Sequence, residues 1–88
     1  MERYRVIDKV TNITESTVIM PERGFGGWLA ANEGTADAKV LGFTLAPGEG
    51  FNNLDSVPVG SIYDSPIEII ITPGAVIRLL RRQATPIK

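Results

Sequence analysis

This chain of 88 residues carries a net charge of −1 and contains neither cysteine nor histidine. Its length suits one domain, and the two missing residue types exclude disulfides, thiolate metal sites and the commonest general base and metal ligand. The balanced charge creates no overall field for nucleic acid or an anionic membrane, so neither is expected as a partner.

The N-terminal stretch MERYRVIDKV alternates charged and apolar residues and has no apolar h-region, so we expect no signal peptide. No apolar run approaches the ~20 residues that span a bilayer. Strands are predicted over residues 4–10, where charges alternate with apolar residues, and over residues 16–20, which end at Pro21 because proline cannot donate to a ladder.

The next segment, PERGFGGWLAAN, raises the question of a phosphate-binding loop. Such a loop needs a third glycine where Leu29 stands, or a Gly-Lys-Ser/Thr triplet, and it opens a helix. Neither pattern is present. We therefore predict a turn or wide loop with positive φ over residues 24–27, which leads into a strand over residues 26–31.

A strand is predicted over residues 39–45, with a bulge or bend at Gly42. APGEG then forms a turn, in which Pro47 sets φ and Gly48 accepts the positive φ of type II. Residues 51–60 are predicted to be mostly irregular, and residues 61–66 a short strand that ends at Pro66.

The last third reads IEIIITPGAVIRLL, two apolar runs around Pro73-Gly74. This pattern predicts a hairpin between residues 67–72 and 75–82, with Ile69 and Leu79 in the core. Residues 75–82 alone could also form a helix, because leucine and arginine are good helix formers. Glycines and prolines spread through the whole chain predict one all-β domain over residues 1–88, a β-sandwich or flattened barrel of six to eight short strands.

No residue pattern predicts catalysis. The acidic residues lie in expected turns, and a chain of this length has little room for the cleft that a carboxylate pair needs. FNNLDS offers too few oxygen donors for calcium. We therefore expect no enzyme activity, no catalytic residue, no metal site and no cofactor.

Surface charge and aromatic rings supply the candidate binding residues. The run of isoleucines is apolar on both parities, so part of it is expected to face a second subunit or a partner, with arginines at the rim. These interface candidates are Ile67, Ile69, Ile70, Ile71, Arg78, Arg81 and Arg82. The alternative interpretation of the arginines is a solvated edge strand.

A second hypothesis is a carbohydrate- or receptor-binding module in which exposed rings stack on the ligand. Phe25, Trp28 and Tyr63 are its candidates, although the large apolar area of Trp28 favours a place in the core.

From Trp28 to about residue 82 the chain resembles small structural virion proteins of tailed bacteriophages. The residues that carry the resemblance are Gly42, Leu45, Pro47, Gly48, Glu49, Ile62, Tyr63 and the apolar run from Val76 to Leu80. The resemblance implies a compact β-fold and a capsid-decorating or tail-associated protein, assembled in the host cytoplasm, with other virion proteins as partners. The small core that 88 residues can build adds the expectation of a homo-oligomer.

Overall fold

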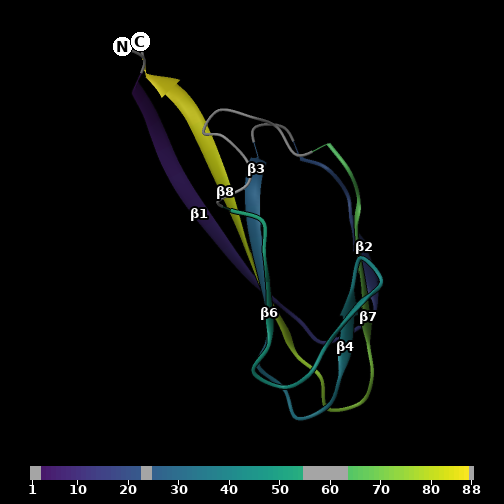
Figure 1. Cartoon of the computed structure of the whole chain (residues 1–88). Helices are drawn as coiled ribbons and strands as arrows, with labels where there is room; N and C mark the ends of the chain where they lie inside the picture. Colours follow the sequence, from purple (N-terminus) through teal and green to yellow (C-terminus); the bar gives the residue numbers. More distant parts are fainter. Residues whose placement is uncertain (1–2, 23–24, 55–63, 88) are drawn as a thin grey trace.

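The computed structural model describes residues 3–22, 25–54 and 64–87. Within these residues the chain forms two antiparallel four-stranded sheets that face each other (Figure 1). Sheet A has the order β1-β8-β3-β6, and sheet B has the order β2-β7-β4-β5. The strands are β1 (Arg3–Ile13), β2 (Thr17–Ile19), β3 (Phe25–Asn32), β4 (Ala38–Val40), β5 (Phe43–Leu45), β6 (Gly50–Asn52), β7 (Ile67–Ile71) and β8 (Ile77–Ile87). The prediction of an all-β sandwich is confirmed.

Of the connections between the described strands, one joins two strands of the same sheet and each of the others joins strands of different sheets. The exception joins β4 to β5, where Leu41 and Gly42 have φ values of 52° and 81°. Two positive φ values in a two-residue loop are typical of the type I′ turn that closes hairpins. The predicted single strand over residues 39–45 is therefore two strands, and Gly42 turns the chain instead of bending it.

The turn at Pro73-Gly74 also differs from its prediction. It is a tight turn, in which the Ala75 amide donates to the Thr72 carbonyl oxygen at 2.9 Å and Gly74 has a φ of 95°. However, β7 lies in sheet B between β2 and β4, whereas β8 lies in sheet A between β1 and β3. The predicted hairpin of residues 67–82 is wrong: the turn carries the chain across the sandwich. Each apolar strand thereby gains two neighbours instead of one.

The turn predicted in APGEG is confirmed. The Glu49 amide donates to the Ala46 carbonyl oxygen at 2.9 Å, and Gly48 has a φ of 87°. Residues 51 and 52, at the start of the stretch predicted to be irregular, belong to strand β6. Residues 55–63 lie outside the described residues, and residues 64–66 belong to no strand, so the strand predicted over residues 61–66 is wrong for that part.

The glycine-rich segment feeds a strand and not a helix. Gly26 and Gly27 lie inside β3 without positive φ, so the predicted wide loop is wrong for these two residues. The register between β3 and β8 shifts between Phe25 and Trp28, which marks a bulge. A Cβ on Gly27 would lie 3.1 Å from Leu54, so a larger residue there would press on the segment after β6.

The core fills the space between the sheets. Its largest fully buried apolar side chains are Trp28, Ile69, Ile77, Leu79 and Val40. Residues of β3 alternate between buried and half-buried positions along the whole strand, as the twofold repeat of a strand requires. The predictions that Ile69 and Leu79 are core residues are confirmed, as is the place of Trp28.

One polar side chain sits in this core. Asn32, which is fully buried, donates from Nδ2 to the carbonyl oxygens of Ala36 and Leu45 at 2.8 and 2.9 Å. Its Oδ1 accepts from the amide of Gly34 at 3.0 Å. The Asn32 side chain thus donates two hydrogen bonds from Nδ2 and accepts one at Oδ1, as a buried amide requires. The three bonds join the loop after β3 to the end of β5.

The sheets differ in length. β1 and β8 have eleven residues each, whereas no strand of sheet B exceeds five. Their antiparallel register is continuous from Arg3–Ile87 to Ile13–Ile77. The two strands therefore extend beyond sheet B as a two-stranded arm, whose end carries the N- and C-terminal ends of the chain (Figure 1). The described residues contain no helix that is long and apolar enough to cross a membrane.

Candidate functional site

Arg81 is the charged interface candidate that the structure places in the interior. It lies on the core-facing side of β8, is 7% exposed, and holds its guanidinium 5.0 Å from the centre of the Phe25 ring. Its Nη1 donates to Oε1 of Glu22 at 2.8 Å. A buried charge is tolerated when it is paired in this way. Arg81 therefore closes the end of the sandwich, and its predicted position at the rim of an outer patch is wrong.

Glu22 links this interior charge to the surface. Lys9 Nζ lies 3.7 Å from the same Oε1 atom that accepts from Arg81. The hydrogen bond from Arg81 lowers the pKa of the Glu22 carboxyl from its usual value, and the charges of Arg81 and Lys9 act in the same direction. The carboxylate thus stays ionised at neutral pH.

A small hollow lies beside Arg81 between the two sheets. Its lining is mostly apolar and comes from β2, β3, β7, β8 and the segments after β2 and before β7, with Glu22 and Arg81 as the charged members. Its free volume is about 20 Å³, which holds roughly one water molecule. A sugar ring does not fit into a space of this size.

The aromatic candidates are less accessible than the second hypothesis requires. Trp28 is 1% exposed and stacks on Phe51, with ring centres 5.2 Å apart and planes 8° from parallel. Phe25 is half-buried beneath the Arg81 guanidinium. Tyr63 lies outside the described residues. Among the described aromatic rings the exposed one is Phe43, which sequence reasoning did not single out. The hypothesis that Trp28 stacks on a ligand is wrong, because its ring is buried.

Arg78 and Arg82 lie on the outer face of sheet A. Arg82 forms a two-pronged contact with Asp8, from Nε to Oδ1 at 2.9 Å and from Nη2 to Oδ2 at 3.2 Å. The Arg82 hydrogen bond lowers the pKa of Asp8. Arg78 lies 3.3 Å from Glu33. β8 is a central strand, so the interpretation of these arginines as a solvated edge strand is also wrong.

The isoleucine candidates split between the two faces of β7. Ile67 and Ile69 are 3% and 1% exposed and belong to the core, where no partner could reach them. Ile71 is half-buried against that core. Ile70 points the other way, is 40% exposed, and stands opposite Lys39 on the outer face of sheet B. Of the four isoleucines, Ile70 alone keeps its predicted place at an outer surface.

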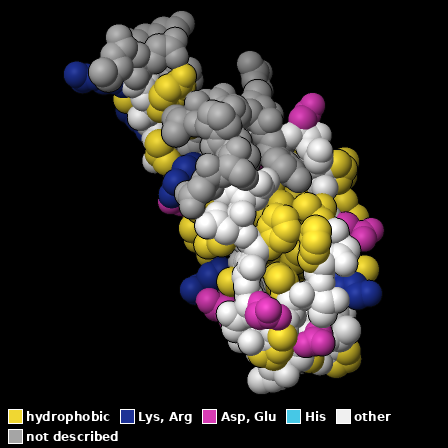
Figure 2. All heavy atoms as spheres, viewed as in Figure 1, with side chains coloured by type: hydrophobic (Ala, Val, Ile, Leu, Met, Phe, Trp, Pro, Cys, Tyr) yellow, Lys and Arg dark blue, Asp and Glu magenta, His cyan; other side chains and the backbone are white. Residues whose placement is uncertain are grey.

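A second apolar surface lies on the outer face of sheet A. Val10, Leu80 and Leu29 are direct neighbours in the register across β1, β8 and β3, and we call them the outer row. Val10 is 52% exposed, and the two leucines are half-buried. The Asp8–Arg82 pair lies beside the row on one side, and Arg78 lies on the other. On the face that Figure 2 presents, which is not the outer face of sheet A, other hydrophobic side chains also reach the surface among charged groups.

Sequence reasoning missed this surface, although a signal was present. The strand over residues 4–10 was predicted, and its apolar residues fall on both parities, which already indicates that one set must face outward. Only the pairing with β8 shows that Val10 stands beside Leu80.

Comparisons with protein-family models, curated proteins and solved structures give no match. Among the described residues, no group of three or more acidic side chains could hold a metal ion. The outer row and its flanking ion pairs are the arrangement with the clearest binding chemistry, because apolar area supplies affinity while charges at the rim orient the partner.

Proposed function

We propose that this chain is a non-enzymatic structural protein of a phage virion, a minor or decorating component that binds capsid or tail proteins. The resemblance of residues 28–82 to small virion proteins supports the class of particle. The outer row supports the mode of action, because it is an apolar strip at the centre of the long sheet with an ion pair at each side.

The outer row carries the proposal. The apolar side chains of the outer row are in unfavourable contact with water, and a partner that covers them gains about 25 cal/mol per Å² of apolar area removed from water. The Asp8–Arg82 and Arg78–Glu33 pairs are exposed, so they contribute orientation more than affinity.

The carbohydrate-binding alternative has less support. Its principal ring, Trp28, is buried, and the hollow beside it is about 20 Å³ in volume. Among the described residues Phe43 is the one exposed ring, and a stacking platform needs two or more exposed rings.

Particles from the source culture test the proposal. Gradient-purified particles are analysed by mass spectrometry and labelled with gold-conjugated antibodies raised against the purified chain. We expect the chain in intact particles, in a constant ratio to a major capsid or tail protein. A chain found in the soluble fraction and absent from the particles contradicts the proposal.

Three surface variants then locate the contact. Leu80→Glu places a charge in the outer row and is expected to reduce incorporation into particles at least tenfold. Thr44→Glu, on the exposed outer face of sheet B, is the matched control and should be incorporated like the wild type. Loss of incorporation in Ile70→Glu with normal incorporation of Leu80→Glu would show that sheet B, and not the outer row, makes the contact.

A further inference from the structure

Exposed apolar side chains concentrate on one edge of the sandwich. Of the eight large hydrophobic side chains that are exposed among the described residues, five lie on β1, on β2 or directly after β2. These five are Val6, Ile7, Val10, Val18 and Met20.

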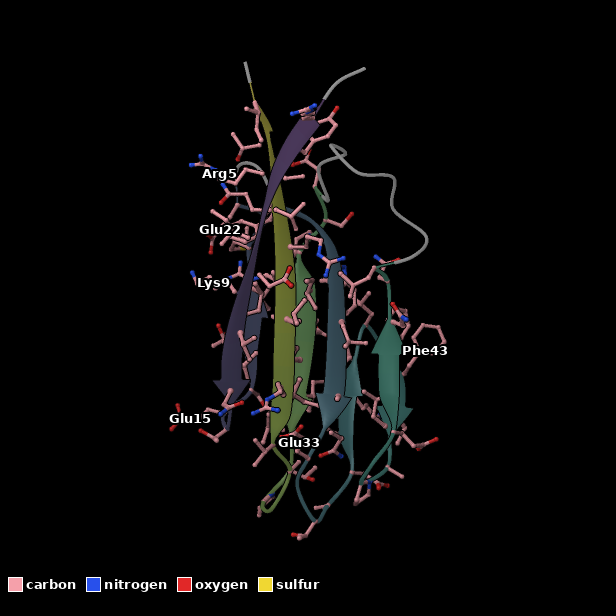
Figure 3. All side chains as sticks on the ribbon, turned by 90° about the vertical axis from the view of Figure 1, so that its left-hand side faces the viewer. Arg5, Lys9, Glu15, Glu22, Glu33 and Phe43 are labelled. Carbon is pink, nitrogen blue, oxygen red and sulfur yellow. The ribbon has the colours of Figure 1, made fainter. Side chains whose placement is uncertain are left out.

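β1 and β2 form the same side of the molecule. Each is an edge strand of its sheet, and three residues link the end of β1 to the start of β2. The opposite edge strands, β5 and β6, meet through Phe43 and Phe51, whose ring centres lie 5.5 Å apart. Figure 3 shows Lys9 and Glu22 on the β1 side and Phe43 on the other side.

β1 is also the strand edge that is best suited to accept another strand. It has eleven residues, pairs with β8 without a bulge, and has no described strand on its other edge. The other edge strands, β2, β5 and β6, have three residues each. The part of β8 that extends beyond β3 contains Pro86, which has no N–H to donate. A long regular edge is a template for strand addition.

Charges on β1 decide whether the added strand can be a second copy. A twofold axis perpendicular to the sheet pairs residues at equal distances on either side of the axis. Registers that pair at least seven residues of β1 have their axis at residue 6, 7, 8, 9 or 10. The first four place like charges directly opposite each other, which destabilises a pair. The opposed charges are Arg3 with Lys9, Arg5 with Lys9, Asp8 with Asp8, and Lys9 with Lys9.

The register with its axis at Val10 has no such conflict. Val10 faces Val10 of the second copy, Lys9 faces Thr11, and Asp8 faces Asn12. Ile7, which is 49% exposed, faces Ile13, whose side chain belongs to the core. Seven residues, 7–13, pair in this arrangement. Every cross-strand pair in it is apolar, polar or a single charge beside a polar group.

We propose that β1 pairs antiparallel with β1 of a second copy about a twofold axis at Val10. Sheet A then continues into the second copy as one sheet of eight strands. The outer row continues with it, because Leu29, Leu80 and Val10 meet the same three residues in reverse order. The inference rests on the proposed function and deepens it, because the dimer presents two outer rows on one joined face.

Met20 gains from the same arrangement. The twofold axis places sheet B of both copies on one side of the joined sheet, so the two β2 strands lie along the new seam. Met20, which directly follows β2 and is 62% exposed, would be screened from water there, whereas Val18 stands opposite Glu68 on the outer face of sheet B and stays exposed. Of the five exposed side chains at this edge, Ile7, Val10 and Met20 therefore lie at the seam of the dimer, whereas Val6 lies outside the paired residues 7–13.

Solution mass is the first test. At roughly 100 µM, a concentration at which complexes of micromolar affinity are formed, light scattering on the wild-type chain should give twice the chain mass of 9.5 kDa. Val10→Lys sets two like charges opposite each other at the axis and should weaken the dimer at least tenfold. Ile70→Lys, which adds the same charge on sheet B, should not. A wild-type monomer at this concentration overturns the proposal.

A cysteine pair tests the register. The chain has no cysteine, so Val10→Cys introduces a single thiol at the axis, where the two Cα atoms of a directly opposed pair lie about 4.5–5.5 Å apart, within disulfide range. Val6→Cys is the matched control on the same face of β1, and its two copies would stand about 27 Å apart along the strands.

Under mild oxidation the Val10→Cys chain should form a covalent dimer at least ten times faster than the Val6→Cys chain. Equal rates, or faster crosslinking of Val6→Cys, overturn the register. These results can be told apart from those of the particle experiment. A wild-type monomer that enters particles contradicts the dimer and leaves the proposed function standing. A dimer that is absent from particles contradicts the proposed function and leaves the dimer standing.

Discussion

At the scale of single residues, Asn32 has the largest structural role for its size. It is buried, and its side chain satisfies two carbonyl oxygens and one amide of neighbouring loops. Asn32→Ala leaves these groups without partners, and each buried group left unsatisfied costs about 1–3 kcal/mol. We expect a loss of about 3 kcal/mol in the free energy of unfolding, measured by urea denaturation.

Asn53→Ala is a suitable comparison for that measurement, because Asn53 is half-buried after β6 and lies outside the core. We expect a smaller loss there than at Asn32. An Asn32→Ala chain as stable as the wild type would show that water replaces the lost amide and that the loops do not depend on it.

Substitutions at two glycines allow the cost of steric crowding to be measured apart from the cost of an unfavourable backbone conformation. A Cβ on Gly34 would lie 2.3 Å from the Gly74 carbonyl oxygen and 2.5 Å from the Val76 amide nitrogen, so the loops must move apart. Gly42 has open space around it but a φ of 81°. Gly42→Ala should cost about 1–2 kcal/mol, the penalty of the left-handed conformation.

Gly34→Ala should cost more than Gly42→Ala, about 3 kcal/mol, because backbone atoms cannot turn away as a side chain would. Thermal denaturation of both variants gives the order. The reverse order would mean that the loops after β3 and β7 separate easily.

The Asp8–Arg82 pair gives a prediction for pH. The hydrogen bond from Arg82 lowers the pKa of Asp8 in the folded chain, so the pair stabilises the fold above the ordinary carboxyl pKa and loses its effect as the pH falls through the lowered value. Both side chains are about two-fifths exposed, which keeps the contribution below about 1 kcal/mol.

Removal of the partner should reverse the shift. In Arg82→Gln the pKa of Asp8 should rise toward its ordinary value, as measured by NMR titration of the Asp8 carboxyl carbon. Arg78→Gln removes an equal charge from the same face but pairs with Glu33, so it should leave the Asp8 titration nearly unchanged. An unshifted Asp8 in Arg82→Gln would contradict the contact.

At the scale of elements, periodicity and turn residues predicted where the strands lie in the sequence better than which strands pair with each other. IEIIIT and the segment after Pro73-Gly74 are strands, and the turn between them exists. With proline at its second position and a φ of 95° at Gly74, the Pro73-Gly74 turn has the features of a type II turn, which does not match the twist of a two-stranded hairpin. Each run also has enough apolar residues to sit at the centre of a sheet. Which sheet each strand joins depends on strands far away in the chain, and no local pattern carries that information.

The same limit applies to the candidate site. Arg81 and Arg82 are adjacent in the sequence and equally basic, yet one lies under Phe25 in the interior and the other meets Asp8 outside. Alternation along β8 predicts that they face opposite ways. Alternation does not say which of the two faces inward. The structure does, because Arg81 shares its face of β8 with the core residues Leu79 and Ile77.

Two consecutive residues of β7 test this alternation. Ile69 is 1% exposed and Ile70 is 40% exposed. Ile69→Ala opens a cavity in the core and should cost about 2–5 kcal/mol, whereas Ile70→Ala should cost about 0.5 kcal/mol or less. Chemical denaturation of both variants measures the difference. Equal losses would mean that a partner covers the outer face of sheet B in the sample.

At the scale of the whole molecule, the arm is less protected than the sandwich body. The chain measures 46 × 21 × 18 Å, and its long axis includes the part of β1 and β8 that sheet B does not cover. Beyond Gln83, β8 has no described strand on the side of β3. Val6 and Ile7 lie on opposite faces of the arm, and each is about half exposed. A two-stranded ribbon of this kind is marginally stable in water.

Hydrogen exchange should therefore vary along the same two strands. Amides of residues 77–80 lie beside fully buried side chains and should exchange only when the whole domain unfolds, whereas amides of residues 3–6 and 84–87 should exchange through local opening, at least a hundred times faster. The dimer with its axis at Val10 pairs residues 7–13, so raising the protein concentration should slow exchange in that stretch and leave residues 3–6 fast. NMR-detected exchange at two concentrations measures both effects. Uniform protection along β1 would mean that the arm is covered from end to end, which a register with its axis at Val10 cannot achieve.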